Sequence, residues 1–151
     1  MKYPRIAHCI LFATACLVTG TVLAAEPEDV IKYRQSVMKA NGAHMAAVAA
    51  IVQGKVDYKN QLGDHVKALQ AINKDIVALF PKDSDFGETK ALDAVWKNNA
   101  DFQKRAKDTA QKADALAKTV AAGDSMNYGP RFKELSETCK SCHKDFRKEE
   151  K

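Results

Sequence analysis

The segment PRFKELSETCKSCHKDFRK, residues 130–148, has the apolar spacing of one face of an α-helix. Side chains three or four residues apart on a helix lie on the same side of it. The residues that share this side are Phe132, Leu135, Cys139, Cys142, His143 and Phe146. The segment therefore predicts an amphipathic helix whose inner face carries two thiols and one imidazole.

This face contains the pentapeptide Cys139-Lys140-Ser141-Cys142-His143. The pattern C-x-x-C-H is typical of c-type haem attachment. Two thiols on one helical face can each form a thioether with a vinyl group of the same porphyrin edge, and the imidazole beside them can bind the iron. We therefore predict one covalent haem c with its iron per chain, attached to Cys139 and Cys142, with His143 as an axial ligand.

Two other uses of the cysteine pair stay open. A redox dithiol usually follows a strand in a βαβ unit, and the chain has no alternation of predicted strands and helices. A structural zinc site usually needs four ligands. Apart from His143, the histidines beyond residue 25 are His44 and His65, so a Cys₂His₂ site would need a ligand from a distant part of the chain.

Residues 1–25 have the features of a secretory signal peptide. Lys2 and Arg5 provide the positive start, and an apolar run follows at residues 9–18. This run is too short for a typical transmembrane helix. We predict cleavage near Ala25 and an exported, periplasmic protein without stable membrane insertion. Lipid attachment at Cys16 is an alternative, but it would leave a very short apolar stretch before that cysteine.

Removal of the first 25 of 151 residues leaves 126, enough for one small domain at residues 26–151. Because Lys2 and Arg5 leave with the signal peptide, the formal net charge falls from +5 to +3. Acidic and basic residues are interspersed, as on a solvated helical surface. No arginine-rich run with interleaved aromatic residues is present, which argues against nucleic-acid binding.

Apolar residues recur at helical spacing along residues 26–151 and predict four helices. These helices are expected from Pro27 to about Gln53, Tyr58 to Leu79, Thr89 to Ala122, and Asn127–Pro130 to about Lys148. Pro27 suits a first helical turn, and Gly54 and Gly123 suit positions just beyond a helix end. Short connections favour antiparallel neighbours. The predicted fold class is all-α, an antiparallel up-down-up-down four-helix bundle with a cofactor slot between facing helices.

The second axial ligand of the iron would decide what the protein does. Methionine sulfur and histidine nitrogen are the plausible donors. Met38 and Met45, seven residues apart, share the inner face of the first helix, and Met126 lies in a predicted turn. His44 borders the inner face, and His65 is expected to face water. A methionine on an apolar stripe is usually core filler, so spacing alone does not choose among these residues.

The chain beyond the signal peptide resembles the class II c-type cytochromes, the cytochrome c′ family. PEDVIKYRQS at residues 27–36 resembles the opening of the family's first helix. Residues 92–102 resemble its third-helix segment, and residues 139–147 match its C-terminal attachment site. In the high-spin members a bulky apolar residue covers the distal iron face at the position of Met38. Met38 followed by KANG at residues 39–42 resembles the low-spin cytochrome c-556 branch, in which this methionine binds the iron.

The resemblance implies Met38 as the sixth ligand, with Met45 as the second choice. It also implies that Arg34 lies near a haem propionate and that Arg147 lies on the side of the proximal histidine. A charge-assisted pair with a propionate is reasonable for either arginine, and the alternative is a solvated surface role. Trp96 and Phe102 are expected to pack in the core and against the haem edge.

His/Met ligation saturates the iron, so the expected function is one-electron transfer rather than catalysis. The expected partners are periplasmic redox proteins, and the chain is expected as a monomer or homodimer. If Met38 does not bind, the iron is five-coordinate, and the alternative is a gas-binding cytochrome c′ that takes nitric oxide or carbon monoxide. A third hypothesis is a zinc or redox-dithiol protein without haem.

Overall fold

The computed structural model of this protein describes residues 26–149. The signal peptide predicted for residues 1–25 lies outside the described residues. Within residues 26–149 the secondary structure is helical, and the only extended pairing is an isolated antiparallel bridge between Ala91 and Arg147. The prediction of an all-α protein is therefore confirmed.

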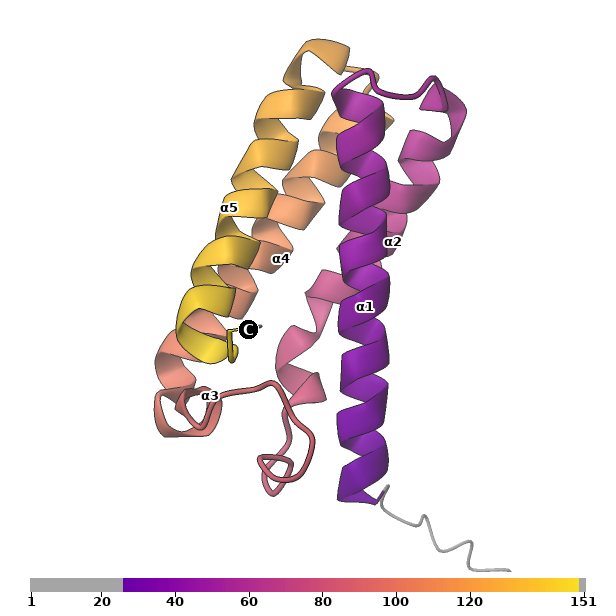
Figure 1. Ribbon diagram of the computed structural model, residues 1–151. Coiled ribbons are helices and arrows are strands. Elements are labelled where there is room, and N and C mark those ends of the chain that lie inside the picture. The colour runs from indigo at the N-terminus through magenta and orange to yellow at the C-terminus, as the bar shows by residue number, and fades with distance from the viewer. Residues whose placement is uncertain (1–25, 150–151) are drawn as a thin grey trace, which may run out of the picture.

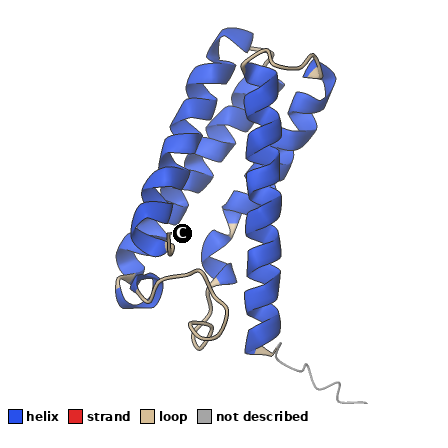
Figure 2. Ribbon diagram, viewed as in Figure 1, coloured by secondary structure: helices blue, strands red, loops and turns tan. Residues whose placement is uncertain are grey.

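Four long helices form an antiparallel bundle (Figure 1). The α-helices are α1 (Pro27–Val52), α2 (Leu62–Lys74), α3 (Ala94–Lys97), α4 (Asn99–Ala121) and α5 (Tyr128–Phe146). Short 3₁₀ turns occupy Lys59–Gln61, Ile76–Leu79 and Ser125–Asn127. The helix α4 packs against both α2 and α5, and α1 packs against α2. Figure 2 shows that the longest irregular stretch lies at one end of the bundle, between the Ile76–Leu79 turn and α3.

Local chemistry accounts for both ends of α1. Pro27 occupies the first turn, where its missing N–H removes no intrahelical hydrogen bond. Glu28 and Asp29 place negative charge near the positive end of the helix dipole. Gly54 ends the helix with a left-handed φ of 68°, a conformation that glycine adopts at little cost. The helix ends within one residue of its predicted boundary.

The predicted second helix is broken near Asp75, so the expected continuous helix from Tyr58 to Leu79 is wrong. Asp75 leaves the helical region with φ −124° and ψ 34°. Two residues earlier, the Asn73 amide donates to the Leu69 carbonyl at 2.7 Å and to the Asn41 side-chain oxygen at 3.1 Å. Such side-chain hydrogen bonds compete with helix continuation, and the chain continues as a separate 3₁₀ turn.

The predicted third helix, from Thr89 to Ala122, is also not continuous. It begins only at Ala94, because residues 89–92 run along the end of α5, and Asn98 separates α3 from α4. The Leu92 N–H donates to the Phe146 carbonyl at 3.0 Å, and the Lys148 N–H donates to the Lys90 carbonyl at 2.8 Å. This pairing also ends α5 at Phe146 rather than near Lys148, since Arg147 adopts an extended conformation. The predicted fourth helix is therefore two residues too long at its C-terminal end.

The buried apolar side chains form two clusters. The first lies where α1 ends and α2 begins, and consists of Val48, Ile51, Leu62, Val66, Leu69, Ala113, Leu116 and Leu135. The second, which we call the lower cluster from its place in Figure 1, consists of Ile76, Val95, Phe102, Ala106 and Phe146. Residues of both clusters are drawn from three or more helices, which is what holds the bundle together.

Candidate haem-binding site

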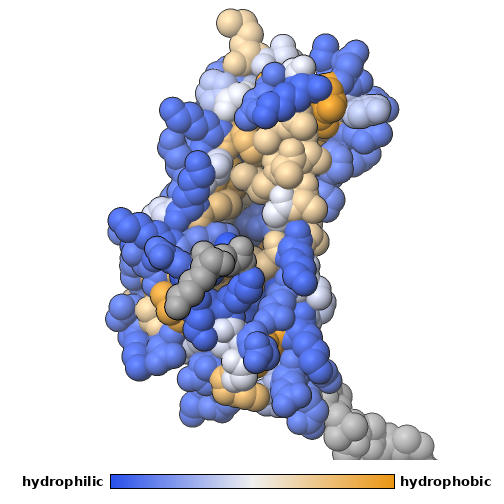
Figure 3. Space-filling view, viewed as in Figure 1, coloured by the Kyte–Doolittle hydropathy of each residue, from blue (hydrophilic) through white to orange (hydrophobic). Residues whose placement is uncertain are grey.

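A cavity of about 740 Å³ lies between α1, α4, α5 and the segment at residues 88–91. Its apolar walls include Met38 and Met45 of α1, Phe102 of α4 and Phe146 of α5. This volume and lining are typical of a cofactor site. On the face between α5 and α1, apolar side chains are exposed among hydrophilic ones (Figure 3).

Helix α5 brings Cys139, Cys142 and His143 to this cavity. Both thiols are free and half-buried, and burial raises the pKa of Cys142 to about 11 and that of Cys139 above its usual value. The His143 ring is exposed, yet nearby protein atoms and the charge of Arg147 lower its pKa. A neutral imidazole is the form that binds a metal.

Helix α1 supplies the facing wall, with Met38 and Met45 both half-buried. Met38 and Cys142 pack against the same lower cluster, whereas Met45 and Cys139 pack against the other cluster. Helices α1 and α5 run in opposite directions (Figure 1), and Met38 of α1 and Cys142 of α5 line the same cavity beside the same lower cluster. Met126 does not line the cavity and is 90% exposed in the turn before α5.

The two remaining histidines contact each other instead of the cavity. The Nδ1 atoms of His44 on α1 and His65 on α2 are 3.0 Å apart, and the rings are partly buried between the helices. The expectation that His65 faces water is therefore wrong. The two helices that carry these rings pack together along their length, and this packing turns both side chains toward each other.

Arg34 lies in the cavity wall and is only 3% exposed. Its guanidinium donates to the Leu79 carbonyl, to the hydroxyl and carbonyl oxygens of Ser84, and to the Thr89 hydroxyl, at 2.8–3.2 Å. It also lies over the Phe80 ring, 4.7 Å from the centroid. Among residues 26–149 no carboxylate pairs with it, and burial lowers its pKa. A buried cation without an acidic partner is costly.

These features fit a haem group. Two thiols and an imidazole lie on one wall, apolar side chains form the interior, and a buried cation lacks an anion. Haem would bring the anion in its propionates and fill the apolar space with its ring. Arg147 also lines the cavity, as does the buried Phe102, whereas half-buried Trp96 lies outside its lining and donates to the Pro81 carbonyl.

Sequence reasoning missed two features of this region. Residues 88–91 form part of the cavity wall, although they were expected in or next to a regular helix. Arg105 of α4 contacts the C-x-x-C-H turn, 36 residues along the chain, at Ser141. Helical periodicity predicts neither contact, because it relates only residues that lie within a few turns of each other in one helix.

The fold and the cavity define a four-helix bundle built for a covalently attached haem. The family model Cytochrome C' matches residues 29–147. Cytochrome c′ of Pararhodospirillum photometricum is 36% identical over 82% of this chain and 99% of the relative. Cytochrome c-556 of Agrobacterium fabrum is 30% identical over 97% of each. A solved nitric oxide complex of a mutant cytochrome c prime from Alcaligenes xylosoxidans has a TM-score of 0.77 and 26% identity, covering 85% and 100% of the two chains.

The chain therefore belongs to the cytochrome c′ family and binds one covalent haem c, with its iron. This family assignment confirms the resemblance and the predicted cofactor. The match to cytochrome c′ is stronger than the match to cytochrome c-556, so the comparisons favour the alternative function over the expected His/Met electron carrier. Within the described residues, no helix is both long and apolar enough to cross a membrane.

Proposed function

We propose that this protein is a periplasmic monohaem cytochrome c′ that binds nitric oxide or carbon monoxide at the iron position facing α1. The main supporting observation is the largely apolar cavity, whose lining includes His143 of α5 and Met38 of α1. Met38 packs against the lower cluster, where a thioether serves as apolar filler. The higher identity to a relative named cytochrome c′ favours the same function.

In this proposal each side chain has a separate task. Haem, when bound, supplies an iron that takes a diatomic gas and exchanges one electron. Cys139 and Cys142 would hold the group covalently through thioethers, and His143 would bind the iron. Arg34 and Arg147 lie in the wall where the acidic propionates would be neutralised. Phe102 and Phe146 exclude water from the interior.

The second candidate is the His/Met electron carrier, in which Met38 binds the iron. One observation favours it: Met38, rather than Met45, packs against the same cluster as Cys142, the cysteine next to His143. Both axial positions would then be filled in both oxidation states, and methionine would raise the reduction potential relative to a second histidine. The protein would carry single electrons to periplasmic redox partners and would not bind gas without losing Met38.

Optical spectra of the purified haem protein, with and without carbon monoxide, separate the two functions. A five-coordinate protein should have a high-spin spectrum, bind carbon monoxide directly, and change little in Met38→Leu. A His/Met protein should show a far-red charge-transfer band when oxidised, and Met38→Leu should abolish it.

Met45→Leu is the matched control, because Met45 lines the same cavity one cluster away. Loss of the far-red band in Met45→Leu instead would assign the sulfur ligand to Met45. A low-spin spectrum that survives in both variants would contradict both candidates and point to a histidine. A pyridine haemochrome assay first establishes that haem is covalently bound.

Export, assembly and the absence of an enzymatic role belong to the same proposal. The signal peptide at residues 1–25, cleaved near Ala25, would deliver residues 26–151 as one domain to the periplasm, where c-type haem attachment takes place. We infer a monomer or homodimer, which sedimentation of the mature protein would distinguish. Mass spectrometry of the mature protein measures the N-terminus directly, and a first residue other than Glu26 would revise the cleavage site.

A further inference from the structure

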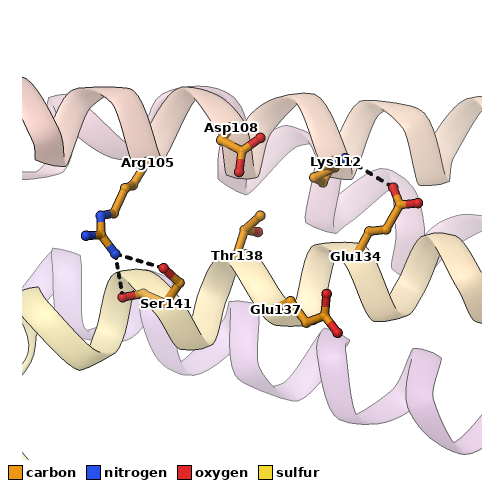
Figure 4. Close-up of a pocket in the computed structure, with 7 residues that line it drawn as sticks. All are labelled: Arg105, Asp108, Lys112, Glu134, Glu137, Thr138 and Ser141. Atoms are coloured by element: carbon orange, nitrogen blue, oxygen red, sulfur yellow. Dashed lines mark hydrogen bonds and ion pairs between the residues drawn. The ribbon is translucent and has the colours of Figure 1, made fainter.

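Arg105 of α4 lies beside the C-x-x-C-H turn of α5, outside the haem cavity. It lines a separate polar hollow of about 320 Å³ between α4 and α5, together with Asp108, Lys112 and Thr138. Figure 4 shows Arg105 and Ser141 at one end of this hollow and Lys112 with Glu134 at the other. The hollow therefore contains two separate links between the same pair of helices.

Arg105 contacts residues that lie on both sides of the predicted ligand His143 along the chain. Its Nη1 donates to the carbonyl and hydroxyl oxygens of Ser141 at 3.0 and 2.8 Å. Its Nη2 lies 2.7 Å from a carboxylate oxygen of Asp145, and its Nε lies 3.0 Å from one of Asp101. The guanidinium carbon lies 5.6 Å from the centroid of the Phe146 ring. Ser141 directly precedes Cys142, and Asp145 follows His143 by two residues.

This arrangement acts on the last turn of α5, which ends at Phe146. The C-terminal end of a helix is the negative end of its dipole, and a cation near it is favourable. A planar guanidinium with several donors also fixes direction, which a single ammonium does not. Arg105 therefore ties the turn carrying Cys142 and His143 to the rigid helix α4 at two points.

Charge balance is the second consequence. Asp101 and Asp145 both pair with Arg105, so this cluster carries one net negative charge with the arginine and two without it. Negative charge near an iron stabilises the oxidised form. The arginine thus holds the potential above the value that the two carboxylates alone would produce.

We propose that Arg105 is a positioning residue for the proximal side of the haem: it sets the placement of the Cys142–His143 turn and the electrostatic balance that tunes the iron. This inference rests on the proposed attachment at Cys142 and ligation by His143. It does not depend on whether the sixth position is open or filled by Met38.

The test uses the haem-loaded protein and three variants. Arg105→Gln removes the charge and most of the hydrogen-bond donors. Arg105→Lys keeps the charge but loses the planar guanidinium, and Lys112→Gln is the matched control. Lys112 links α4 to Glu134 of α5 at 3.2 Å in the same hollow, away from the haem turn. The reduction potential is measured by optical redox titration, and amide hydrogen exchange is followed in peptides covering residues 139–147.

Arg105→Gln should lower the reduction potential and speed exchange in residues 139–147 about tenfold, through loss of charged hydrogen bonds. Arg105→Lys should have a reduction potential close to that of the wild type but show the faster exchange. It also tests the positioning role if Arg105→Gln folds poorly. Lys112→Gln should leave the potential and the exchange of this segment as in the wild type.

Arg105 variants that match Lys112→Gln in both measurements would overturn the inference. Unchanged exchange with a lowered potential would leave only a charge effect and would overturn the positioning role. Absence of covalent haem would overturn the proposed attachment and this inference together. A haem protein that fails to bind gas but shows the expected shifts would overturn the gas-binding function alone.

Discussion

The buried side chain of Arg34 holds one segment of the cavity wall in place through hydrogen bonds. The guanidinium is buried and holds Ser84 and Thr89, which are 50 and 55 residues away along the chain. Burying a cation costs free energy that its hydrogen bonds must offset. Because the bonds reach the segment that forms the cavity wall, the same residue supports both the fold and the site.

Replacing Arg34 by alanine should destabilise the haem-loaded protein by about 3 kcal/mol, since several hydrogen bonds to a buried charged group are lost. Urea unfolding followed by far-UV circular dichroism measures this loss. Arg131→Ala is the control, because Arg131 is exposed and its ion pair within residues 26–149 is with Glu134. Equal unfolding midpoints for the two variants would contradict the structural role of Arg34.

At the residue scale, the sequence and its family resemblance predict that Met38 and Arg34 lie near the haem. Neither indicates that Arg34 would be enclosed by Ser84 and Thr89. Those hydroxyl groups lie in an irregular segment without periodicity, and nothing in the local sequence pairs them with α1. The contacts of Arg105 are hidden for the same reason.

Helices α4 and α5 are joined across their polar side by charged contacts as well as by apolar packing. Lys112 of α4 and Arg131 of α5 both donate to the carboxylate of Glu134. These hydrogen bonds hold the pKa of Glu134 below its usual value. A carboxylate with a lowered folded-state pKa stabilises the fold when ionised, at pH values above its unfolded-state pKa.

Glu134→Gln should therefore be less stable than the wild type at neutral pH, and the difference should shrink as pH falls through the folded-state pKa of Glu134. Protonation then removes from the wild type the same interaction that the variant lacks. Urea midpoints of both proteins across an acidic series measure this change. Glu137→Gln is the control, since Glu137 forms a long ion pair with Lys133, at 3.9 Å, in the described part of the chain. A difference that stays constant with pH would contradict the prediction.

Element boundaries follow the sequence where the cause is local. Pro27 and Gly54 mark the ends of α1 because each acts through its own backbone. The break at Asp75 and the extended residues 89–92 depend on partners elsewhere, namely Asn41 and the end of α5. Apolar spacing continues through both places, which is why continuous helices are predicted there.

At the scale of the whole molecule, two apolar clusters leave a large cavity between them. Its walls include Met38, Met45 and Phe102. Without haem, water would meet these apolar surfaces, which is unfavourable. A group that binds only the folded state stabilises that state. The stability of the bundle should therefore depend on haem attachment.

The double substitution Cys139→Ser/Cys142→Ser should abolish covalent haem and lower the melting temperature by about 10 °C, the size expected for a loss of a few kcal/mol in a domain of this length. A pyridine haemochrome assay and thermal circular dichroism measure the two effects. Lys140→Ala keeps both thiols within the same turn and should retain haem. A haem-free protein with an unchanged melting temperature would contradict the dependence on haem.

The sequence by itself determined the helical bundle, the family and the covalent haem, because helical periodicity and the C-x-x-C-H spacing act over a few residues of one chain segment. The tertiary structure alone decided which distant side chains come together: Met38 and Cys142 at one cluster, Arg34 in the cavity wall, His44 against His65, and Arg105 on the haem-bearing turn. These pairs are separated by 21 to 104 positions, so only the packing of one helix on another brings them together.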